Sequence, residues 1–142
     1  MSEPIKRYNE HGVLTKVEYL NGAGERHRDE GPAVLRYHGN GVLSDEEYYQ
    51  NGQLHREDGP ACVYCRPDKS VTLREYYLEG LRHREDGPAF VSTRPDGSTR
   101  MEMYCLYGKL HREDGPASIL YRQDGSIESA THALRGERVE KL

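Results

Sequence analysis

The sequence predicts an all-β fold, an elongated antiparallel meander of stacked β-hairpin repeats that form a single-layer twisted sheet. The heptapeptide HREDGPA occurs at 55–61, 83–89 and 111–117, and a near-copy, HRDEGPA, occurs at 27–33. Successive motifs begin 28 residues apart, a period typical of repeat proteins in which neighbouring units supply each other's core. Only 35% of the 142 residues are hydrophobic, which favours a thin architecture over a thick two-layer core.

The repeats also set the expected domain organisation. We expect one repeat domain over residues 1–142, with an N-terminal cap of about 1–20 and a C-terminal cap of about 133–142. The four repeats between them span about 21–48, 49–76, 77–104 and 105–132. Terminal repeats are usually atypical because one side has no neighbour. At the C-terminal end, Val139 indeed stands where the motif places His.

The first predicted strand of each repeat follows the motif Pro. These segments are AVLRY (33–37), ACVYC (61–65), AFVST (89–93) and ASILY (117–121), and their third residue is always aliphatic. A turn segment comes next, such as HGNG (38–41) or RPDG (94–97). Asp-Gly, at 96–97 and 124–125, predicts a two-residue hairpin turn because Gly takes a positive φ at little cost.

The second predicted strand of each repeat covers 42–49, 70–77 and 98–105 and ends at a turn built on Gly52, Gly80 or Gly108. With a leading strand in YNEHGVLTKVEYL, the sum is a ten-strand meander. The second strands carry a tyrosine ladder, formed by Tyr48, Tyr76 and Tyr104 and joined by Tyr19. A helix is considered only for the C-terminal stretch SATHALRGERVEKL, residues 129–142.

Composition narrows the class of protein. A formal net charge of −4 is unlike that of a basic nucleic-acid-binding domain. No apolar run approaches the roughly 20 residues that span a bilayer, and the N-terminus lacks the apolar stretch of a signal peptide. Three Cys are too few, and odd in number, for a secreted disulfide framework. We therefore expect a soluble cytoplasmic protein with free thiols and no nucleic-acid partner or membrane insertion.

The frame Tyr-x-x-x-Gly-x-x-His followed by Gly-Pro-Ala and Asp-Gly, as in YYQNGQLHREDGPACVY, resembles the MORN repeat and its bacterial variants. The resemblance covers about residues 8–136 and departs from the family where Arg-Glu-Asp separates His from Gly. It implies a single-layer sheet of stacked hairpins that serves as an interaction scaffold or spacer. Variant repeats of this kind also occur in bacterial, phage and giant-virus genomes, where some look like antitoxin or inhibitor components.

The motif residues have structural explanations that compete with functional ones. Gly-Pro forms a corner that begins a strand where no backbone donor is needed. Arg and the two acidic residues predict a charge-paired ladder, since adjacent copies should stack roughly 10 Å apart. The first copy reads Asp29-Glu30 where the others read Glu-Asp. A pairing surface tolerates that exchange better than a metal-binding or catalytic carboxylate does. The motif His is expected to pack against a strand Tyr or to bond a loop carbonyl.

Catalysis and metal binding receive little support from the pattern. One His and one carboxylate per loop fall short of the usual ligand count, and the spacing of Cys62 and Cys65 within a strand sends their sulfurs to opposite faces. A catalytic centre needs an asymmetric set of groups in a pocket, whereas this chain repeats one chemistry at regular steps. We therefore expect no enzyme activity, no cofactor and no metal.

The most direct interpretation is a rigid scaffold that binds a partner protein, as an adaptor, antitoxin-like protein or inhibitor. Tyr and Arg are enriched at binding hot spots, and a homodimer is plausible because sheet edges can pair. The alternative is capture of a small anion, a nucleotide or lipid headgroup, by the Arg and His loops, which requires Arg side chains free of carboxylate partners. The candidate contact residues are Tyr48, Tyr76, Tyr104, Arg56, Arg84, Arg112, His55, His83 and His111.

Overall fold

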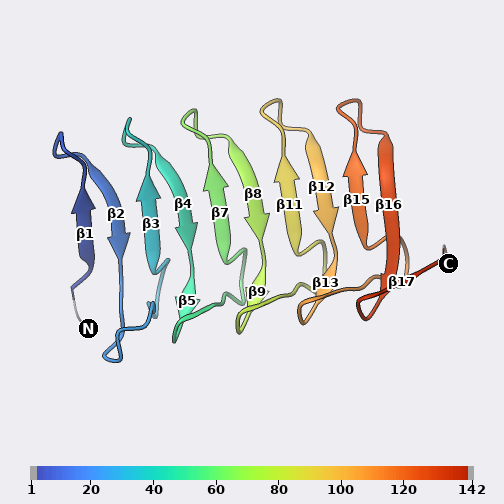
Figure 1. Ribbon diagram of the computed structural model, residues 1–142, viewed down its shortest axis with the longest axis horizontal. Helices are drawn as coiled ribbons and strands as arrows, with labels where there is room; N and C mark the ends of the chain where they lie inside the picture. The colour runs from blue at the N-terminus through green and yellow to red at the C-terminus, as the bar shows by residue number, and fades with distance from the viewer. Residues whose placement is uncertain (1–2, 141–142) are drawn as a thin grey trace.

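The chain forms one long open sheet, described by a computed structural model over residues 3–140 (Figure 1). Eleven strands follow one another in the order β1-β2-β3-β4-β7-β8-β11-β12-β15-β16-β17, and every pairing is antiparallel. This confirms the predicted all-β meander of hairpin repeats, with eleven strands in the sheet where ten were expected. The strands of the sheet are β1 (Ile5–Tyr8), β2 (Leu14–Glu18), β3 (Val34–Tyr37), β4 (Leu43–Glu47), β7 (Cys62–Cys65), β8 (Val71–Glu75), β11 (Phe90–Thr93), β12 (Thr99–Met103), β15 (Ser118–Tyr121), β16 (Ile127–Leu134) and β17 (Glu137–Val139).

Each large hairpin closes through a three-residue loop, and the prediction of two-residue Asp-Gly turns is wrong. In the hairpin of β11 and β12, the Arg94 N–H donates to the Ser98 carbonyl and the Gly97 N–H donates to the Arg94 carbonyl. Gly97 has φ 88° and is left-handed, whereas Asp96 is not. A type I turn followed by one left-handed residue adds a bulge to the strand. The register accordingly shifts between Ser92 and Thr93.

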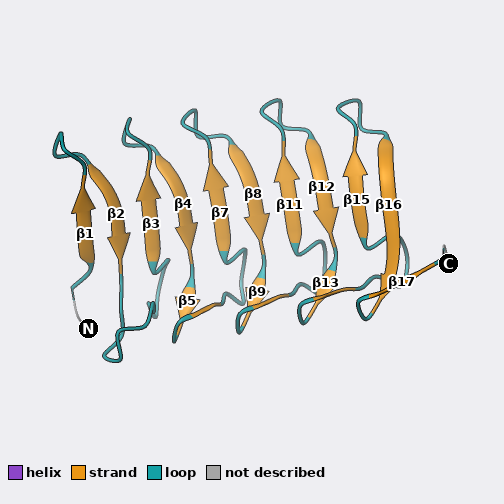
Figure 2. Ribbon diagram, in the orientation of Figure 1, coloured by secondary structure: helices purple, strands orange, loops and turns teal. Residues whose placement is uncertain are grey.

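Three of the two-residue turns lie instead in short hairpins at the other end of the strands, away from the large hairpin loops (Figure 2). These are β5 (Tyr49–Gln50) with β6 (Gln53–Leu54), β9 (Tyr77–Leu78) with β10 (Leu81–Arg82), and β13 (Cys105–Leu106) with β14 (Lys109–Leu110). In the second of them, Glu79 and Gly80 have φ 48° and 80°. Positive φ at both central residues defines the type I′ turn, whose twist suits tight hairpins. The predicted second strands therefore end at residues 47, 75 and 103, and a short hairpin follows each.

The C-terminal stretch is a hairpin, so the helix considered there is wrong for residues 129–140. β16 and β17 pair through His132↔Val139, Ala133↔Arg138 and Leu134↔Glu137. Arg135 and Gly136, with φ 53° and 85°, form the same type I′ turn as the inner repeats, because the repeat pattern continues to Gly136. Residues 1, 2, 141 and 142, which belong to the predicted caps, lie outside the described residues. Residues 3–140 contain no helical segment with the length and apolar character needed to cross a bilayer.

The core is thin and depends on small side chains. The Ala that ends each motif has no exposed surface, at Ala33, Ala61, Ala89 and Ala117. Its N–H and C=O bond to the strands on both sides: the Ala61 N–H donates to the Glu75 carbonyl, and its carbonyl accepts the Tyr48 N–H.

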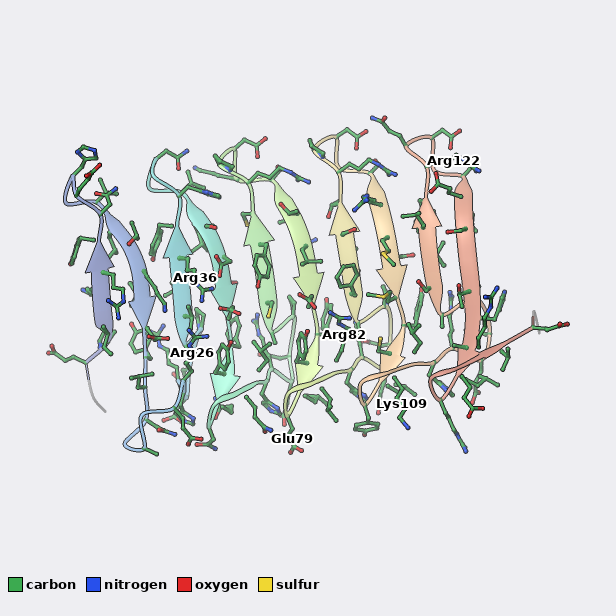
Figure 3. The ribbon with its side chains drawn as sticks, in the orientation of Figure 1. Arg26, Arg36, Glu79, Arg82, Lys109 and Arg122 are labelled. Carbon is green, nitrogen blue, oxygen red and sulfur yellow. The ribbon has the colours of Figure 1, made fainter. Side chains whose placement is uncertain are left out.

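The two faces of the sheet differ in chemistry. On one face the register alternates aliphatic and charged residues, with Leu35↔Glu46 and Val63↔Arg74 as examples, and the tyrosine ladder continues this face. The other face carries an ionic cluster in its N-terminal half, where Arg36 contacts Asp45 and Glu47 at 2.6 Å each (Figure 3). These two carboxylates raise the pKa of Arg36 despite the opposing effect of its partial burial.

Candidate binding clefts along the motif loops

Three equivalent open clefts lie between successive motif loops, at the end of the strands that carries the short hairpins. The first, second and third clefts lie between successive loops and have volumes of about 660, 620 and 600 Å³. Each is lined by Arg and the two acidic residues of one loop, by a Tyr of the ladder, and by His, Arg and the two acidic residues of the next loop. The same chemistry is therefore presented three times in a row.

Each motif Arg stacks on a Tyr of the ladder. The guanidinium carbon lies 4.0 Å from the ring centroid in the pairs Arg56–Tyr48 and Arg84–Tyr76, and 3.9 Å in Arg112–Tyr104. The first repeat has the same contact between Arg28 and Tyr19, at 4.0 Å. Arg over an aromatic face is a favourable cation–π geometry. The ladder is thus half-buried under guanidinium groups, where it supports the motif loop.

The same guanidinium packs against the motif Gly and leaves little space for a side chain there. A Cβ on Gly87 would lie 3.0 Å from the Cζ atom of Arg84, closer than side chains normally approach. The neighbouring Arg84 Nη1 donates to the Pro88 carbonyl at 3.1 Å. Of the four motif glycines, only Gly31 has a φ in the left-handed region, 112°. Close approach of Arg, more than backbone conformation, therefore explains the Gly of the other three copies.

The acidic residues project into solvent at the rims of the clefts. Arg84 Nε donates to Asp86 Oδ1 at 3.0 Å, and the other two full motifs repeat this pair at 3.0 and 3.1 Å. Asp86 and Glu85 remain 87% and 79% exposed. In the first copy the exchanged acid makes a different contact, since Asp29 bonds His27 Nε2 at 2.9 Å. Each Arg of the full motifs therefore forms an ion pair with the Asp of its own loop, while the acidic side chains remain exposed to solvent.

The motif His holds the next repeat, a role that the sequence reasoning missed. His55 Nδ1 accepts the Glu79 N–H at 2.9 Å, and His83 Nδ1 accepts the Tyr107 N–H at 2.9 Å. His27 and His111 make the same bond to the next type I′ turn. Its partner is always the non-glycine residue with positive φ, so the imidazole supports a backbone conformation that L-residues rarely adopt. The expected carbonyl partner for His is therefore wrong, although His83 does pack on the Tyr107 ring at 4.1 Å.

A second set of contacts joins the repeats at the other end of the strands, where the large hairpin loops lie. Arg66 Nη2 donates to the Thr93 carbonyl at 2.5 Å, and Arg94 Nη2 makes the equivalent bond to the Tyr121 carbonyl. The Ser98 hydroxyl and the Gln123 amide both donate to Asp96, and these hydrogen bonds lower the pKa of Asp96 to about 2. The 28-residue spacing of Arg66, Arg94 and Arg122 was the available sequence signal for this row.

All nine predicted contact residues line the three clefts. Each cleft is also lined by a residue of a short hairpin that sequence reasoning did not select: Gln50 in the first and Leu78 and Leu106 in the other two. These positions belong to the short hairpins, which the sequence pattern did not separate from the long strands. The selected residues therefore all lie at the clefts, whereas the acidic residues and the short-hairpin residues that also line them were not selected.

The cysteines lie apart from the clefts and are free. Burial, followed by the nearby Glu47 and Glu75 carboxylates, raises the pKa of the Cys62 thiol to about 12. Among residues 3–140, no group of three His, Cys, Asp or Glu side chains is placed to hold a metal ion. Comparisons of the chain with protein-family models, curated proteins and solved structures found no match.

Proposed function

We propose that this protein is a non-enzymatic scaffold that binds an extended segment of a partner protein along its three clefts. The observation that carries the proposal is the threefold recurrence of one lining chemistry at a fixed step. Equivalent positions of adjacent repeats are two strands apart, roughly 10 Å. A polyproline-type segment advances about 9 Å in three residues, so every third side chain of such a ligand meets an equivalent cleft.

The charge of the cleft rims defines the chemistry of the partner. Highly exposed Glu side chains line the clefts: Glu57, Glu85 and Glu113 are 79–84% exposed and lie 3.7–3.8 Å from Nε2 of the motif His in the same loop. The guanidinium groups of the full motifs are already stacked on Tyr and paired with Asp. Lys or Arg side chains of a partner would complement this surface, and their stems would pack on Leu78 and Leu106, which line the second and third clefts.

The alternative of small-anion capture is supported less well by these contacts. It requires cationic side chains that are free to bind a phosphate, and Arg56, Arg84 and Arg112 each have a carboxylate at 3.0–3.1 Å. Releasing one of them would also break its contact with the Tyr ring. An adaptor or inhibitor role of bacterial or phage origin, and the relationship to MORN repeats, remain predictions from the sequence resemblance.

A spacing series of synthetic peptides tests the proposal by calorimetry. We expect a Pro-rich peptide with Lys at every third position to bind the wild-type protein, and a peptide of equal charge with Lys at every second position to bind more weakly. Changing Glu57, Glu85 and Glu113 together to Gln should abolish binding. A matched control with the same change in net charge alters exposed acids away from the clefts: Glu3→Gln, Glu10→Gln and Glu137→Gln.

Two results would overturn the proposal. One is equal binding by both peptide spacings, or equal loss in the control variant, because general charge attraction would then explain the affinity. The other is binding of inorganic pyrophosphate that disappears when Arg84 is changed to Ala, which would favour anion capture. Loss of peptide affinity with added salt is expected in either case, because exposed charges are screened.

A further inference from the structure

The two ends of the sheet carry strand edges that the inner repeats show to be complementary. On β16, residues 127–131 pair with β15 on one side, and no described strand pairs with them on the other side. At the opposite end, β1 pairs with β2 only, and Ile5 and Tyr8 are 44% and 59% exposed. An unpaired edge presents a row of free N–H and C=O groups to another strand.

The inner repeats show what such an edge binds. The second strand of every repeat pairs with the first strand of the next, as in β12 with β15: Met101↔Leu120, Glu102↔Ile119 and Met103↔Ser118. The same register recurs 28 residues earlier between β8 and β11 and again between β4 and β7. β16 has the position of a second strand, so its free edge is shaped for the first strand of a repeat.

β1 is such a first strand. Residues 5–14, IKRYNEHGVL, match residues 34–43, VLRYHGNGVL, with the shared Arg, Tyr, Gly, Val and Leu in the same places. Both segments shift register between the Arg and the Tyr, at Arg7/Tyr8 and Arg36/Tyr37. In the inner strand β3 the corresponding edge pairs with β2, whereas no described strand pairs with this edge of β1.

We propose that the edge of β1 in one copy of this protein pairs with the edge of β16 in a second copy. The inner register is carried over by the 28-residue step from β12 to β16 and by the 29-residue offset between β3 and β1. It gives the pairs Ser129↔Arg7, Ala130↔Lys6 and Thr131↔Ile5. Lys6 then lies diagonally across from Glu128, so the junction contains a favourable opposite-charge pair. The contact continues the meander from one molecule into the next.

Arg122 provides a second, independent observation. Arg66 and Arg94 each reach a carbonyl of the following repeat, at Thr93 and Tyr121. Arg122 occupies the same position in the last hairpin (Figure 3), where its Nη1 atom donates to Ser126 and to the Ile127 carbonyl of the same hairpin. In the proposed junction the carbonyl equivalent to Tyr121 is that of Tyr8 in the second copy. The guanidinium is therefore already placed to donate across the junction.

The symmetry of this contact determines what it builds. Two different edges meet, so the interface is heterologous and leaves one free edge of each kind on every assembly, which generates open chains. A few backbone hydrogen bonds and one charge pair make each junction weak. Assembly should therefore increase continuously with concentration and show no plateau at the mass of a dimer.

Analytical ultracentrifugation of charge variants tests the proposal. We expect the weight-average mass of the wild-type protein to rise with concentration. Ala130→Lys, which places Lys opposite Lys6, should reduce association at least tenfold. Ala130→Glu should strengthen association, and the double change Ala130→Lys with Lys6→Glu should restore it. Ala130 and Lys6 are both exposed in the single molecule, so folding, checked by circular dichroism, should not change.

Three results would overturn the proposed junction. The first is a wild-type protein that remains monomeric at the highest soluble concentration. The second is an association that Ala130→Lys leaves unchanged, or that the double change fails to restore. The third is a plateau at exactly twice the monomer mass, which indicates a closed dimer through another surface. None of these results bears on peptide binding in the clefts, which uses different residues.

Discussion

The stack of Arg84 on Tyr76 allows the structural role of the motif to be measured. In Arg84→Ala the Arg84 N–H bond to the Cys105 carbonyl is kept, while the side chain loses the ring contact and the bond to the Pro88 carbonyl. The ring contact is worth about 1–2 kcal/mol in a half-buried setting. A hydrogen bond from a charged donor contributes about 1.5–3 kcal/mol. Because water reaches part of this site, we expect a total loss of about 2–4 kcal/mol in the free energy of unfolding.

The carboxylate partner of Arg84 provides the contrast. Asp86 is 87% exposed, and exposed ion pairs contribute less than about 1 kcal/mol. Asp86→Ala should therefore change the free energy of unfolding by much less than Arg84→Ala. Arg84→Lys should behave like the Ala variant, since an ammonium group cannot stack as a plane and donate to Pro88 together.

Urea denaturation followed by circular dichroism measures these differences. A double-mutant cycle with Tyr76→Leu and Arg84→Ala should give a coupling energy of about 1 kcal/mol, within the range found for residues in contact. Equal destabilisation by Asp86→Ala and Arg84→Ala would refute the reasoning. So would a coupling energy near zero, because the ring contact would then contribute nothing beyond separate burial.

The remaining predictions concern the contact between repeats, the thiols and the loop carboxylates. His83→Ala should lower the free energy of unfolding, measured by urea denaturation, by about 1–3 kcal/mol because the Tyr107 N–H loses its acceptor. His83→Asn, which offers an oxygen, should recover part of that loss. Equal values for both variants would contradict this role. Cys62, whose pKa is about 12, should react with a maleimide at pH 8 far more slowly in the folded protein than in urea. Mass spectrometry of the labelled peptide measures both rates, and equal rates would exclude the burial of this thiol. The pKa of Asp96 is lowered to about 2 by hydrogen bonds from Ser98 and Gln123, so the stability that it contributes is fully present above its ordinary pKa near 4 and is lost as the pH falls toward 2. Asp96→Asn should flatten that part of the stability curve, and an unchanged acid limb would contradict the assignment.

Local chemistry explains what could be predicted from the sequence. The period, the strand segments and the turn glycines are each encoded within a few residues, so the hairpin meander was predictable. Two-residue turns were assigned to Asp96-Gly97 on the strength of the dipeptide. The structure instead places them at Asn51-Gly52, a dipeptide that favours such turns, and at pairs such as Glu79-Gly80, where no local preference favours the positive φ of the first residue. A contact with a distant His supplies the missing stabilisation.

The residues of the candidate site, too, could be predicted only in part. Tyr76, Arg84 and His83 could be selected because they recur at one spacing and belong to residue types common in interfaces. Leu78, which also lines the second cleft, could not be selected, because its place depends on the short hairpin that follows the second strand. The sequence also could not show whether a motif Arg is free to bind a ligand, because a carboxylate and an aromatic ring of the protein itself can both bind its guanidinium group.

The sequence by itself determined the repeat, the antiparallel order of the strands and the identity of the residues at each equivalent position. Only the tertiary structure decided how those residues are used. It directed Arg84 onto Tyr76 and against Gly87, directed His83 to the turn of the next repeat, and left the carboxylates facing outward. The physical reason is that each of these contacts joins groups brought together by loop folding or by stacking of neighbouring repeats. Their partners are set by three-dimensional proximity, which a 28-residue period does not specify.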